Sequence, residues 1–257
     1  MLSTAVSNKS SIYEVNRNPI TKHSGFLVFK FKDFNSTVEY YRSPFLVVQG
    51  HPPVGAPPEV KYALRVDQMD WSSNQWRDAD LLILSSGRWW TYEKTVREGC
   101  NFQEGEEIKM DMTVEAGYRR SIETVVDWVN TQVNTKKTRV FFRTFAPSHF
   151  SGGNWKHGGR CHMEILPDLG PLKGTVSSHL EIVSDVFSQK PNSLEVLNVT
   201  NMAMRRNDGH PSIYNKPPEN QSASHGQDCS HWCLPGLPDS WNELLYAIFL
   251  KQELIWP

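Results

Sequence analysis

TRVFFRTF, residues 138–145, decides the fold class of this 257-residue chain, because this β-rich run lies between two segments with the apolar spacing of helices. Branched and aromatic side chains of this kind favour strands. Two more strand patterns occupy residues 81–84 and 194–199, and helical patterns run over 113–133 and 176–187. Strands that alternate with crossover helices predict a layered α/β sheet. Such sheets place their chemistry in loops beyond the carboxyl ends of the strands.

The flanking sequence has other patterns. In chain order it predicts a hairpin over 26–31 and 37–41, an extended run over 44–48, a surface loop over 51–58 and a helix over 240–251. The loop follows from four prolines and a glycine, which exclude both a helix and an interior strand. The helix has apolar residues on one face, and Asp239 before it is the expected N-cap.

The composition excludes several classes of protein. Lys and Arg number 27 against 28 Asp and Glu, so the net charge of -1 gives no general attraction to nucleic acid or anionic lipid. Hydrophobic residues make up 39% of the chain, which is enough for a core and argues against disorder. The longest aliphatic run, residues 81–84, is far shorter than the roughly 20 residues of a membrane helix. The first residues lack the pattern of a secretory signal.

The most informative segment for chemistry is QDCSHWCLPG, residues 227–236, which contains an acid and an imidazole three residues apart. Asp228 can hydrogen-bond the ring of His231, fix its tautomer and stabilise the imidazolium that forms when the ring accepts a proton. These are two of the three members of an acyl-transfer triad. The alternative is a local capping pair without catalytic function.

The cysteines of the chain allow two interpretations. Cys229 and Cys233, with Cys161 and the adjacent His162, could bind zinc through thiolates and imidazole. Disulfides that fix the loop fit the spacing better, because it is not that of a C-x2-C pair. The other histidines have no informative spacing, and solvent or capping roles are expected for them: His23, His51, His149, His157, His179, His210 and His225.

Two clusters combine aromatic rings with positive charge. They are Gly87-Arg88-Trp89-Trp90, after the strand pattern of residues 81–84, and FFRTF, residues 141–145. Indole faces stack on sugar rings, and an arginine can anchor an acidic sugar or a carbonyl. The alternative is that these aromatic side chains fill the core.

Six motifs give the chain a close resemblance, over nearly its whole length, to a known family. They are FKFKDFNSTVEYYRSPFLV (29–47), MDWSSNQWRDADLLIL (69–84), GRWWTYEKT (87–95), GCNFQEGEE (99–107), FFRTFAPSHFSGGNW (141–155) and DCSHWCLPGLPDSWNELLYA (228–247). The chain resembles the plant trichome-birefringence-like proteins, which are wall-polysaccharide O-acetyltransferases of the PC-esterase superfamily. The last motif matches the D-x-x-H block of that family.

The resemblance implies a fold, a reaction and a location. The fold is an SGNH-like three-layer α/β/α sandwich with a mostly parallel sheet, and residues 1–257 are expected to be the carboxyl-terminal part of a single PC-esterase domain, incomplete at its start. The reaction is transfer of an acetyl group to hydroxyls of pectin, xylan or mannan, without a bound cofactor or metal ion. The acetyl donor is not identified, and nucleic acid is not among the expected partners. The location is the Golgi, through a membrane anchor that these residues do not contain.

The resemblance also assigns roles to individual residues. Asp228 matches the triad acid and His231 the triad base. Cys229 is implied to pair with Cys161, and Cys233 with a cysteine upstream of this chain. Four residues match the oxyanion region and acceptor groove: Gly87, Trp89, Trp90 and Arg143.

The chain departs from the family at the nucleophile. The family has its catalytic Ser in a G-D-S motif at the end of the first core strand, and no Gly-Asp-Ser occurs in the 257 residues. The chain is therefore expected to begin downstream of that motif, to lack the first core strand, to fold poorly alone and to have no acyl-transfer activity alone. Ser3, Ser230 and Ser240 are weak substitutes, because none lies at a strand-to-helix elbow. The alternatives are an inactive glycan-binding fragment and a non-functional truncated duplicate.

A second departure lies in the block after residues 81–84. The Asn and His that the family has around the glycine of this block are Ser85 and Arg88 here. Loss of an oxyanion-hole amide costs about 3 to 4 kcal/mol of transition-state stabilisation in comparable sites.

Overall fold

The computed structural model describes residues 9–21, 24–170, 178–191, 193–221 and 226–255, in two compact units, 1–44 and 45–257. In the first unit, strands β1 (Ile12–Glu14), β2 (Phe26–Phe31) and β3 (Ser36–Tyr41) form an antiparallel sheet in the order β1-β2-β3. The predicted hairpin is confirmed, with Phe26 opposite Tyr41 and Phe31 opposite Ser36.

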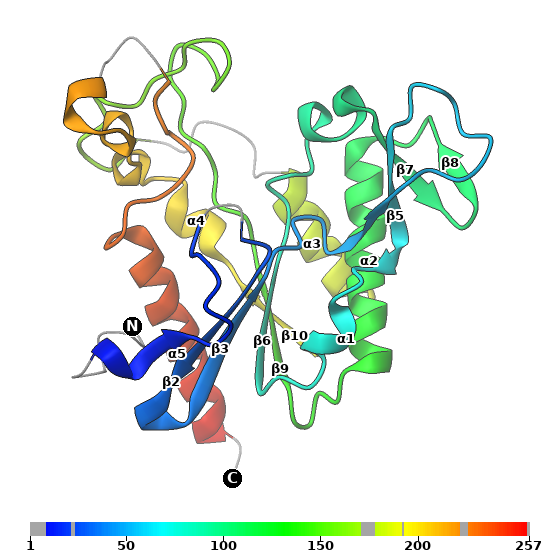
Figure 1. Ribbon diagram of the computed structural model, residues 1–257, viewed down its shortest axis with the longest axis horizontal. Coiled ribbons are helices and arrows are strands. Elements are labelled where there is room, and N and C mark those ends of the chain that lie inside the picture. Colours follow the sequence, from blue (N-terminus) through cyan, green and yellow to red (C-terminus); the bar gives the residue numbers. More distant parts are fainter. Residues whose placement is uncertain (1–8, 22–23, 171–177, 192, 222–225, 256–257) are drawn as a thin grey trace. The chain divides into compact units, whose positions relative to one another are not determined.

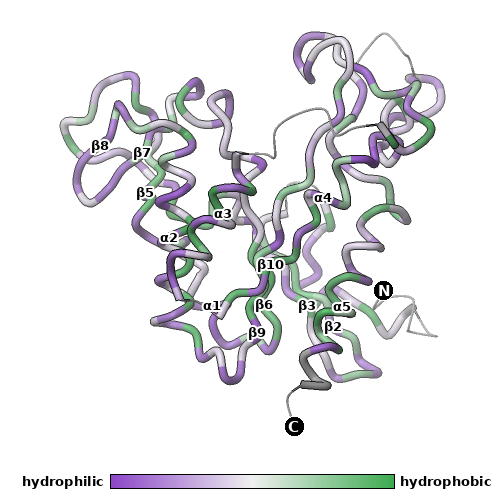
Figure 2. The backbone as a smooth tube through the Cα atoms, turned by 180° about the vertical axis from the view of Figure 1, so that it is seen from behind, coloured by the Kyte–Doolittle hydropathy of each residue, from purple (hydrophilic) through white to green (hydrophobic). Residues whose placement is uncertain are grey.

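The second unit contains the predicted parallel strands. They are β6 (Leu81–Ser85), β9 (Arg139–Arg143) and β10 (Leu194–Leu197), in the order β10-β9-β6 (Figure 1). The central strand β9 is the most buried, since Val140, Phe141 and Phe142 are at most 2% exposed. Hydrophobic residues continue along β6 (Figure 2), but Leu81 and Ile83 of this strand are 37% and 42% exposed. Among the described residues β6 pairs only with β9, so its other edge is open.

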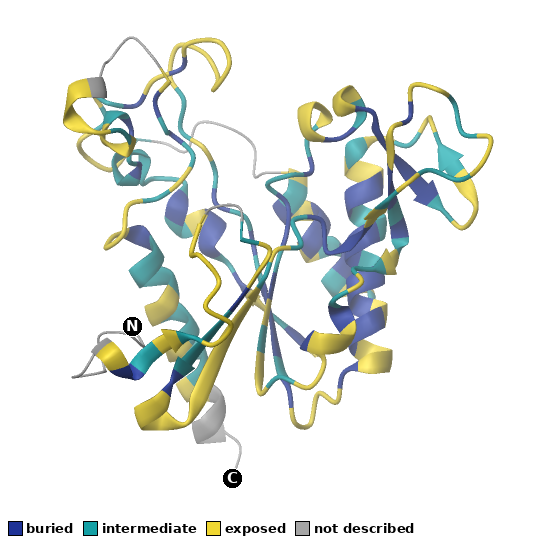
Figure 3. Cartoon of the chain, viewed as in Figure 1, coloured by how far each residue is buried: buried dark blue, intermediate teal, exposed yellow. Residues whose placement is uncertain are grey.

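The two predicted crossover helices are present as α2 (Val114–Gln132) and α3 (Ser178–Gln189). Thr113 caps α2, because its side chain accepts the Ala116 N–H at 3.1 Å. The side of α2 that faces the strands is buried (Figure 3). Position 176, predicted as part of α3, lies outside the described residues. Helix α3 packs beside α2, and its Phe187 ring contacts that of Phe142 in β9 at 5.7 Å.

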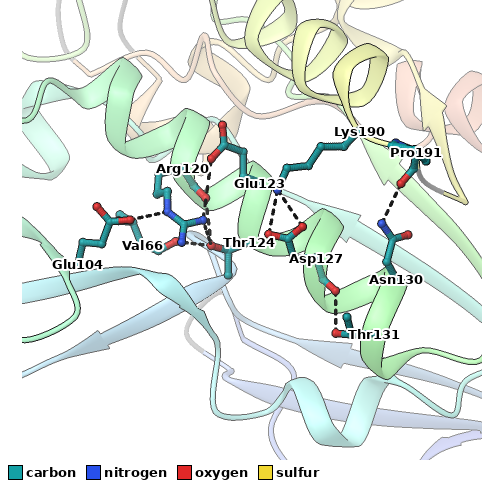
Figure 4. Close-up of polar contacts among 10 residues, drawn as sticks. All are labelled: Val66, Glu104, Arg120, Glu123, Thr124, Asp127, Asn130, Thr131, Lys190 and Pro191. Atoms are coloured by element: carbon teal, nitrogen blue, oxygen red, sulfur yellow. Dashed lines mark hydrogen bonds and ion pairs between the residues drawn. The ribbon is translucent and has the colours of Figure 1, made fainter.

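Polar contacts fix α2 to its neighbours at both ends (Figure 4). Towards the amino end, Arg120 Nε donates to Glu104 Oε1 at 2.6 Å, and Thr124 Oγ1 donates to the Val66 carbonyl at 2.7 Å. Towards the carboxyl end, Lys190 Nζ lies 2.8 Å from Asp127 Oδ1. The position of α2 against its neighbours is therefore fixed by polar contacts as well as by the packing of its apolar face.

Four strands form a second sheet of the unit, in the order β4-β5-β7-β8. They are β4 (Val47–Gly50), β5 (Tyr62–Met69), β7 (Cys100–Glu104) and β8 (Glu107–Lys109), and only the β5–β7 pairing is parallel. Only residues 47–48 of the extended run expected over 44–48 lie in β4, because 44–46 form a bend in which Leu46 has a φ of 61°. The loop over 51–58 is confirmed. Strands β5 and β7 were not predicted, because polar residues such as Arg65, Asp67 and Asn101 interrupt their apolar pattern. The mixed α/β class is confirmed, but the described strands of this unit form two sheets.

The last helix, α5 (Leu237–Ile255), begins three residues earlier than expected. Asp239 is therefore not the N-cap but lies within the first turn, where Oδ2 accepts the Gly236 N–H at 2.8 Å. The carboxylate still satisfies a backbone donor at the helix start. The apolar face of α5 packs on a buried cluster that includes Ala146 and Leu197.

The remaining helices are short. They are α1 (Ser73–Trp76), α4 (Val199–Ala203) and 3-10 turns at Lys9–Ser11, Lys32–Phe34, Tyr92–Lys94, Val96–Glu98, Asn207–Gly209, Ile213–Asn215 and Pro218–Asn220. Within the part of the chain that the structure describes, no helix has both the length and the apolar character needed to cross a membrane.

Candidate functional site

The carboxyl ends of the three parallel strands are tied together by side chains. At the ends of β6 and β9, Arg143 Nε and Nη2 donate to Ser85 Oγ at 3.1 and 2.6 Å. At the ends of β9 and β10, Thr144 Oγ1 accepts the N–H groups of Val199 and Thr200, each at 3.1 Å. These bonds build a connected edge, which is where the sequence predicted the chemistry.

The predicted acid and base are in contact next to this edge. Asp228 Oδ2 lies 2.8 Å from His231 Nδ1, and the His231 backbone N–H donates to Oδ1 at 2.9 Å. Because Nδ1 donates to the carboxylate, the neutral ring has its lone pair on Nε2. The His231 side chain is 77% exposed, and Nε2 has no hydrogen bond to any described residue. The geometry is that of a base held in one tautomer and open to a reactant.

The environment keeps Asp228 ionised. Burial by itself would raise the pKa of this carboxyl, but hydrogen bonds from the His231 side chain and from the His231 and Ser230 N–H groups lower it well below its usual range. An ionised Asp228 favours the imidazolium that His231 forms when it takes a proton. The backbone N–H groups of Ser230 and His231 donate to Asp228 as in a local capping pair, which was the alternative interpretation. These bonds also hold the carboxylate in place beside the His231 ring.

Long-range contacts hold the dyad segment in place. Cys229 forms a disulfide with Cys161, 68 residues away, as the resemblance implied. The Cys229 carbonyl accepts the His149 N–H at 2.9 Å, and Asp228 forms an isolated β-bridge with Ser212. Because the disulfide uses the sulfurs of Cys161 and Cys229, the zinc interpretation is wrong.

The other two cysteines are free thiols. Cys233 is exposed, and its implied partner lies outside the 257 residues, so that pairing stays a prediction. Cys100 is buried; burial raises the pKa of its thiol to about 11 against a hydrogen bond from Gln49, which lowers it.

The residues assigned to an oxyanion region and acceptor groove differ in position. Gly87 adopts a φ of 124°, and a Cβ there would lie 3.2 Å from Phe145 Cβ, so the turn requires glycine. Trp89 is half-buried, as is Arg143. Trp90 is 0% exposed, and its Nε1 donates to Ser86 Oγ at 2.9 Å. The ring of Trp90 is therefore part of the core, which was the alternative interpretation, and a role of this residue in shaping the oxyanion region stays a prediction.

Positive charges gather on the two segments that flank the dyad, residues 85–94 and 143–156. They contain four cations, Arg88, Lys94, Arg143 and Lys156, against one acid, Glu93. None of the four forms an ion pair with a described residue.

Two of the cations are the guanidinium groups of Arg88 and Arg143, of which Arg88 lies in the field of Asp228. Burial lowers the pKa of Arg88, and the charge of Asp228 opposes this effect. Burial also lowers the pKa of Arg143, and the positive charge of Arg88 lowers it further. The charge of Arg88 thus acts on Arg143, while the carboxylate of Asp228 acts on Arg88.

The other two cations lie close to the rings of two tryptophans. Lys94 Nζ lies 5.3 Å from the ring centroid of Trp89 and 5.2 Å from that of Trp155, and Lys156 Nζ lies 4.7 Å from the latter. Trp155 is 56% exposed. We call Arg88, Trp89, Lys94, Arg143, Trp155 and Lys156 the cationic–aromatic cluster. The sequence predicts no separate role for Trp155, because its contact with Lys94 joins residues that are 61 positions apart.

The structure also brings together two histidines for which the sequence indicated no special role. His149 Nδ1 and His210 Nε2 are 2.7 Å apart, and His210 Nδ1 is 2.6 Å from the carbonyl of His231. The partners are 61 and 21 positions apart, so spacing alone does not reveal them.

A hollow of about 370 Å³ lies beside the disulfide, lined by Ser151, Gly152, Gly158, Arg160, Cys161, His162, Met163 and Glu164. Neither member of the dyad lines it. Gln227 orders one wall, since its Oε1 accepts the N–H groups of Cys161 and His162 at 2.8 and 2.9 Å.

Comparisons with known proteins bear on the family of this chain. A model of PC-Esterase, described as the GDSL/SGNH-like Acyl-Esterase family found in Pmr5 and Cas1p, matches residues 1–248. Protein trichome birefringence-like 9 of Arabidopsis thaliana is 45% identical over 257 residues, which cover 98% of this chain and 62% of that relative. Protein trichome birefringence-like 6 of the same plant is 42% identical, with 98% and 53% covered. Protein trichome birefringence is 38% identical, with 96% and 41% covered. The chain thus spans between 41% and 62% of the lengths of these relatives.

Proposed function

This chain belongs to the PC-Esterase family of GDSL/SGNH-like acyl-esterases, among the trichome birefringence-like proteins, and we propose that it acts in acyl transfer on a polysaccharide. The observation that carries the proposal is the 2.8 Å contact between Asp228 Oδ2 and an exposed His231 ring. In this role His231 is the general base, and Asp228 holds its tautomer and stabilises its charged form.

The proposed reaction has two steps. His231 Nε2 takes the proton of a serine hydroxyl as that oxygen attacks the acetyl donor, and the leaving group departs with the proton that His231 returns. His231 then takes the proton of a sugar hydroxyl, whose oxygen attacks the acetyl carbon. The ester passes to the sugar, and the serine recovers its proton from His231.

The nucleophile is part of the proposal. The 257 residues contain no Gly-Asp-Ser, and we propose that the nucleophilic serine comes from sequence outside them. The open edge of β6, where Leu81 and Ile83 are exposed, would accept the first core strand of the three-layer sandwich. That layer arrangement agrees with α5 packing near β10 and α3 contacting β9. Residence in the Golgi belongs to the same proposal.

The cationic–aromatic cluster bears on the acceptor. Among pectin, xylan and mannan, the cluster favours pectin, because unpaired guanidinium and ammonium groups complement uronate carboxylates. The exposed face of Trp155 offers a surface on which a sugar ring can stack.

The experiment is covalent trapping with p-nitrophenyl acetate, followed by addition of oligogalacturonide and mass spectrometry of protein and sugar. We expect an acetylated serine on the protein produced with its preceding sequence, then an acetylated sugar, and neither product with Asp228→Asn. An acetyl-serine that forms equally well in Asp228→Asn would contradict the proposed dyad. The 257 residues alone should form no adduct.

The second candidate is a glycan-binding protein without catalysis. It is favoured by the position of Ser85, which replaces the Asn of the family and has its hydroxyl occupied by Arg143 at 2.6 Å. It predicts that oligogalacturonide binds and that no acetyl-enzyme forms under any condition above.

A further inference from the structure

His149 and His210 link two backbone carbonyls through a continuous chain of three polar contacts. His149 Nε2 lies 3.2 Å from the carbonyl of Met204, its Nδ1 lies 2.7 Å from His210 Nε2, and His210 Nδ1 lies 2.6 Å from the carbonyl of His231. The last carbonyl belongs to the residue that the proposed function uses as base. The His149 backbone N–H also binds the Cys229 carbonyl, so His149 holds the dyad segment at two points.

A count of protons shows what this chain requires. A carbonyl oxygen only accepts, so both outer contacts need a proton on the ring nitrogen, at His149 Nε2 and His210 Nδ1. A neutral imidazole has a single N–H, so two neutral rings have no proton left for the central contact. Two lone pairs would then face each other at 2.7 Å. All three hydrogen bonds form together only when the pair holds three protons and one positive charge.

The surroundings of the pair contain charges of both signs. Glu164, Asp168 and Asp208 act on His149, while Asp228 and Arg88 act on His210. His210 is 6% exposed, and the ring of Trp232 covers it at a centroid distance of 4.1 Å. Trp232 in turn contacts Trp241 of α5 at 6.0 Å. The rings are therefore held close together by packing, whatever their protonation.

We propose that His149 and His210 are positioning residues that fix the backbone of His231 and act as one proton-sharing unit. The inference rests on the proposed function only for the role of His231. With two protons, the pair satisfies the two carbonyls and leaves the central contact unmade. With a third proton, the pair is bonded along its whole length and holds the dyad segment more rigidly.

Burial sets the pH at which the third proton binds. It lowers the pKa of His210 to about 4, opposed by the hydrogen bond to the His231 carbonyl, and it also lowers the pKa of His149. The pair is therefore neutral at neutral pH and becomes fully bonded in the acidic range below the ordinary pKa of 6.5.

The direct test is nitrogen-15 NMR of the histidine rings during a pH titration, which needs no turnover. Above the ordinary His pKa of about 6.5 we expect His210 as the Nδ1–H tautomer and His149 as the Nε2–H tautomer. On acidification, His149 Nδ1 and His210 Nε2 should shift together in one step. His210 in the Nε2–H form at high pH, or two rings that titrate independently, would overturn the proposal.

Variants separate positioning from a merely structural role. His149→Asn places an amide N–H near the Nδ1 position, so it can donate to neutral His210 without an added proton. His149→Phe keeps the ring shape and donates nothing. We expect His149→Phe to lower kcat about 10- to 100-fold with KM unchanged, and His149→Asn to restore kcat and remove the acidic inflection that the pair causes. The matched control is His157→Phe, an exposed histidine in the following loop, which should change neither quantity.

Failure of the two proposals can be told apart. The proton shared by His231 Nδ1 and Asp228 reports the dyad geometry by NMR even in an inactive protein. Its loss in His149→Phe but not in His149→Asn supports positioning, and an unchanged signal in both overturns it. If wild type transfers no acetyl group while this signal responds as expected, the proposed function fails and the positioning role stands.

Discussion

The two histidine arrangements at this site differ in the origin of their contacts. His231 is tied to Asp228 within three residues, and its side chain is 77% exposed. His149 and His210 meet across 61 residues, and His210 is 6% exposed. The first arrangement is set by a single turn of chain, and the second exists only once β9 and the loops after it have folded. The comparison separates a reactive group from the scaffold that holds it.

The largest effect is expected from breaking the local pair with Asp228→Asn. The amide cannot stabilise the imidazolium and permits the wrong tautomer, so kcat for acetyl transfer should fall about 10³- to 10⁴-fold. Steady-state kinetics measure it on the protein produced with its preceding sequence. The control Asp239→Asn changes an acid that binds only the Gly236 N–H, and it should leave kcat unchanged. A loss smaller than that of His149→Phe would reverse the ranking of the two arrangements.

Removing the support that both arrangements share should cost stability. The disulfide of Cys161 and Cys229 closes a separation of 68 residues, which corresponds to about 4 kcal/mol of unfolding free energy. We expect the double variant Cys161→Ser, Cys229→Ser to lose stability of this size in denaturant unfolding.

Cys233→Ser, made in the 257 residues alone, is the matched control for the disulfide, because that thiol is exposed and free in the structure. It should unfold at the same denaturant concentration as wild type. Equal losses in the two variants would show that the tether contributes no more than an unpaired cysteine.

The same distinction explains what the sequence could predict of the site. Asp228 and His231 were found because their contact is local, and the disulfide because a specific motif implied it. The burial of Trp90 could not be predicted, since a tryptophan in a charged motif can face either solvent or core. The His149–His210 pair had no signal, because neither residue has an informative neighbour in the chain.

The fold shows the same limit. Helix α2 and strand β9 were predicted nearly to the residue, because apolar periodicity and the Thr113 cap are local signals. Strand β5 was missed, because Arg65 and Asp67 alternate with its inward positions and the polar Gln68 follows them. Helix α5 starts before its expected cap, since Asp239 binds a backbone N–H from inside the first turn. The pairing of strands and the long-range contacts of side chains thus determine features of the fold that the local sequence pattern does not predict.

A falling pH should reduce stability through His210 before it does so through the carboxylate of Asp228. The folded-state pKa of His210 is about 4, below its ordinary 6.5, so the unfolded chain binds the proton first. This contribution to stability is present above pH 6.5 and is lost as the pH falls towards 4. It amounts to at most about 3 kcal/mol.

The measurement is the unfolding free energy as a function of pH for wild type and His210→Asn. In His210→Asn, the unfolding free energy should no longer fall between pH 6.5 and pH 4. The fall below pH 3.8, the ordinary pKa of an aspartate, should remain, because it is caused by protonation of Asp228. An unchanged slope would mean that His210 is not the group responsible.

The smallest effect is expected at Ser230, which lies between the acid and the base. Its backbone N–H donates to Asp228 Oδ1 at 3.1 Å, whereas its hydroxyl is 3.3 Å from the same oxygen. Ser230→Ala removes only the longer contact, so the unfolding free energy should change by less than about 0.5 kcal/mol. The rate of acetyl transfer should stay within about twofold of wild type. Among the described residues, Ser230 has its hydroxyl hydrogen-bonded to the acid of the dyad, so it is a local candidate for the nucleophile. Abolished acyl-enzyme formation in Ser230→Ala would therefore move the nucleophile into this segment and make the local pair a complete triad.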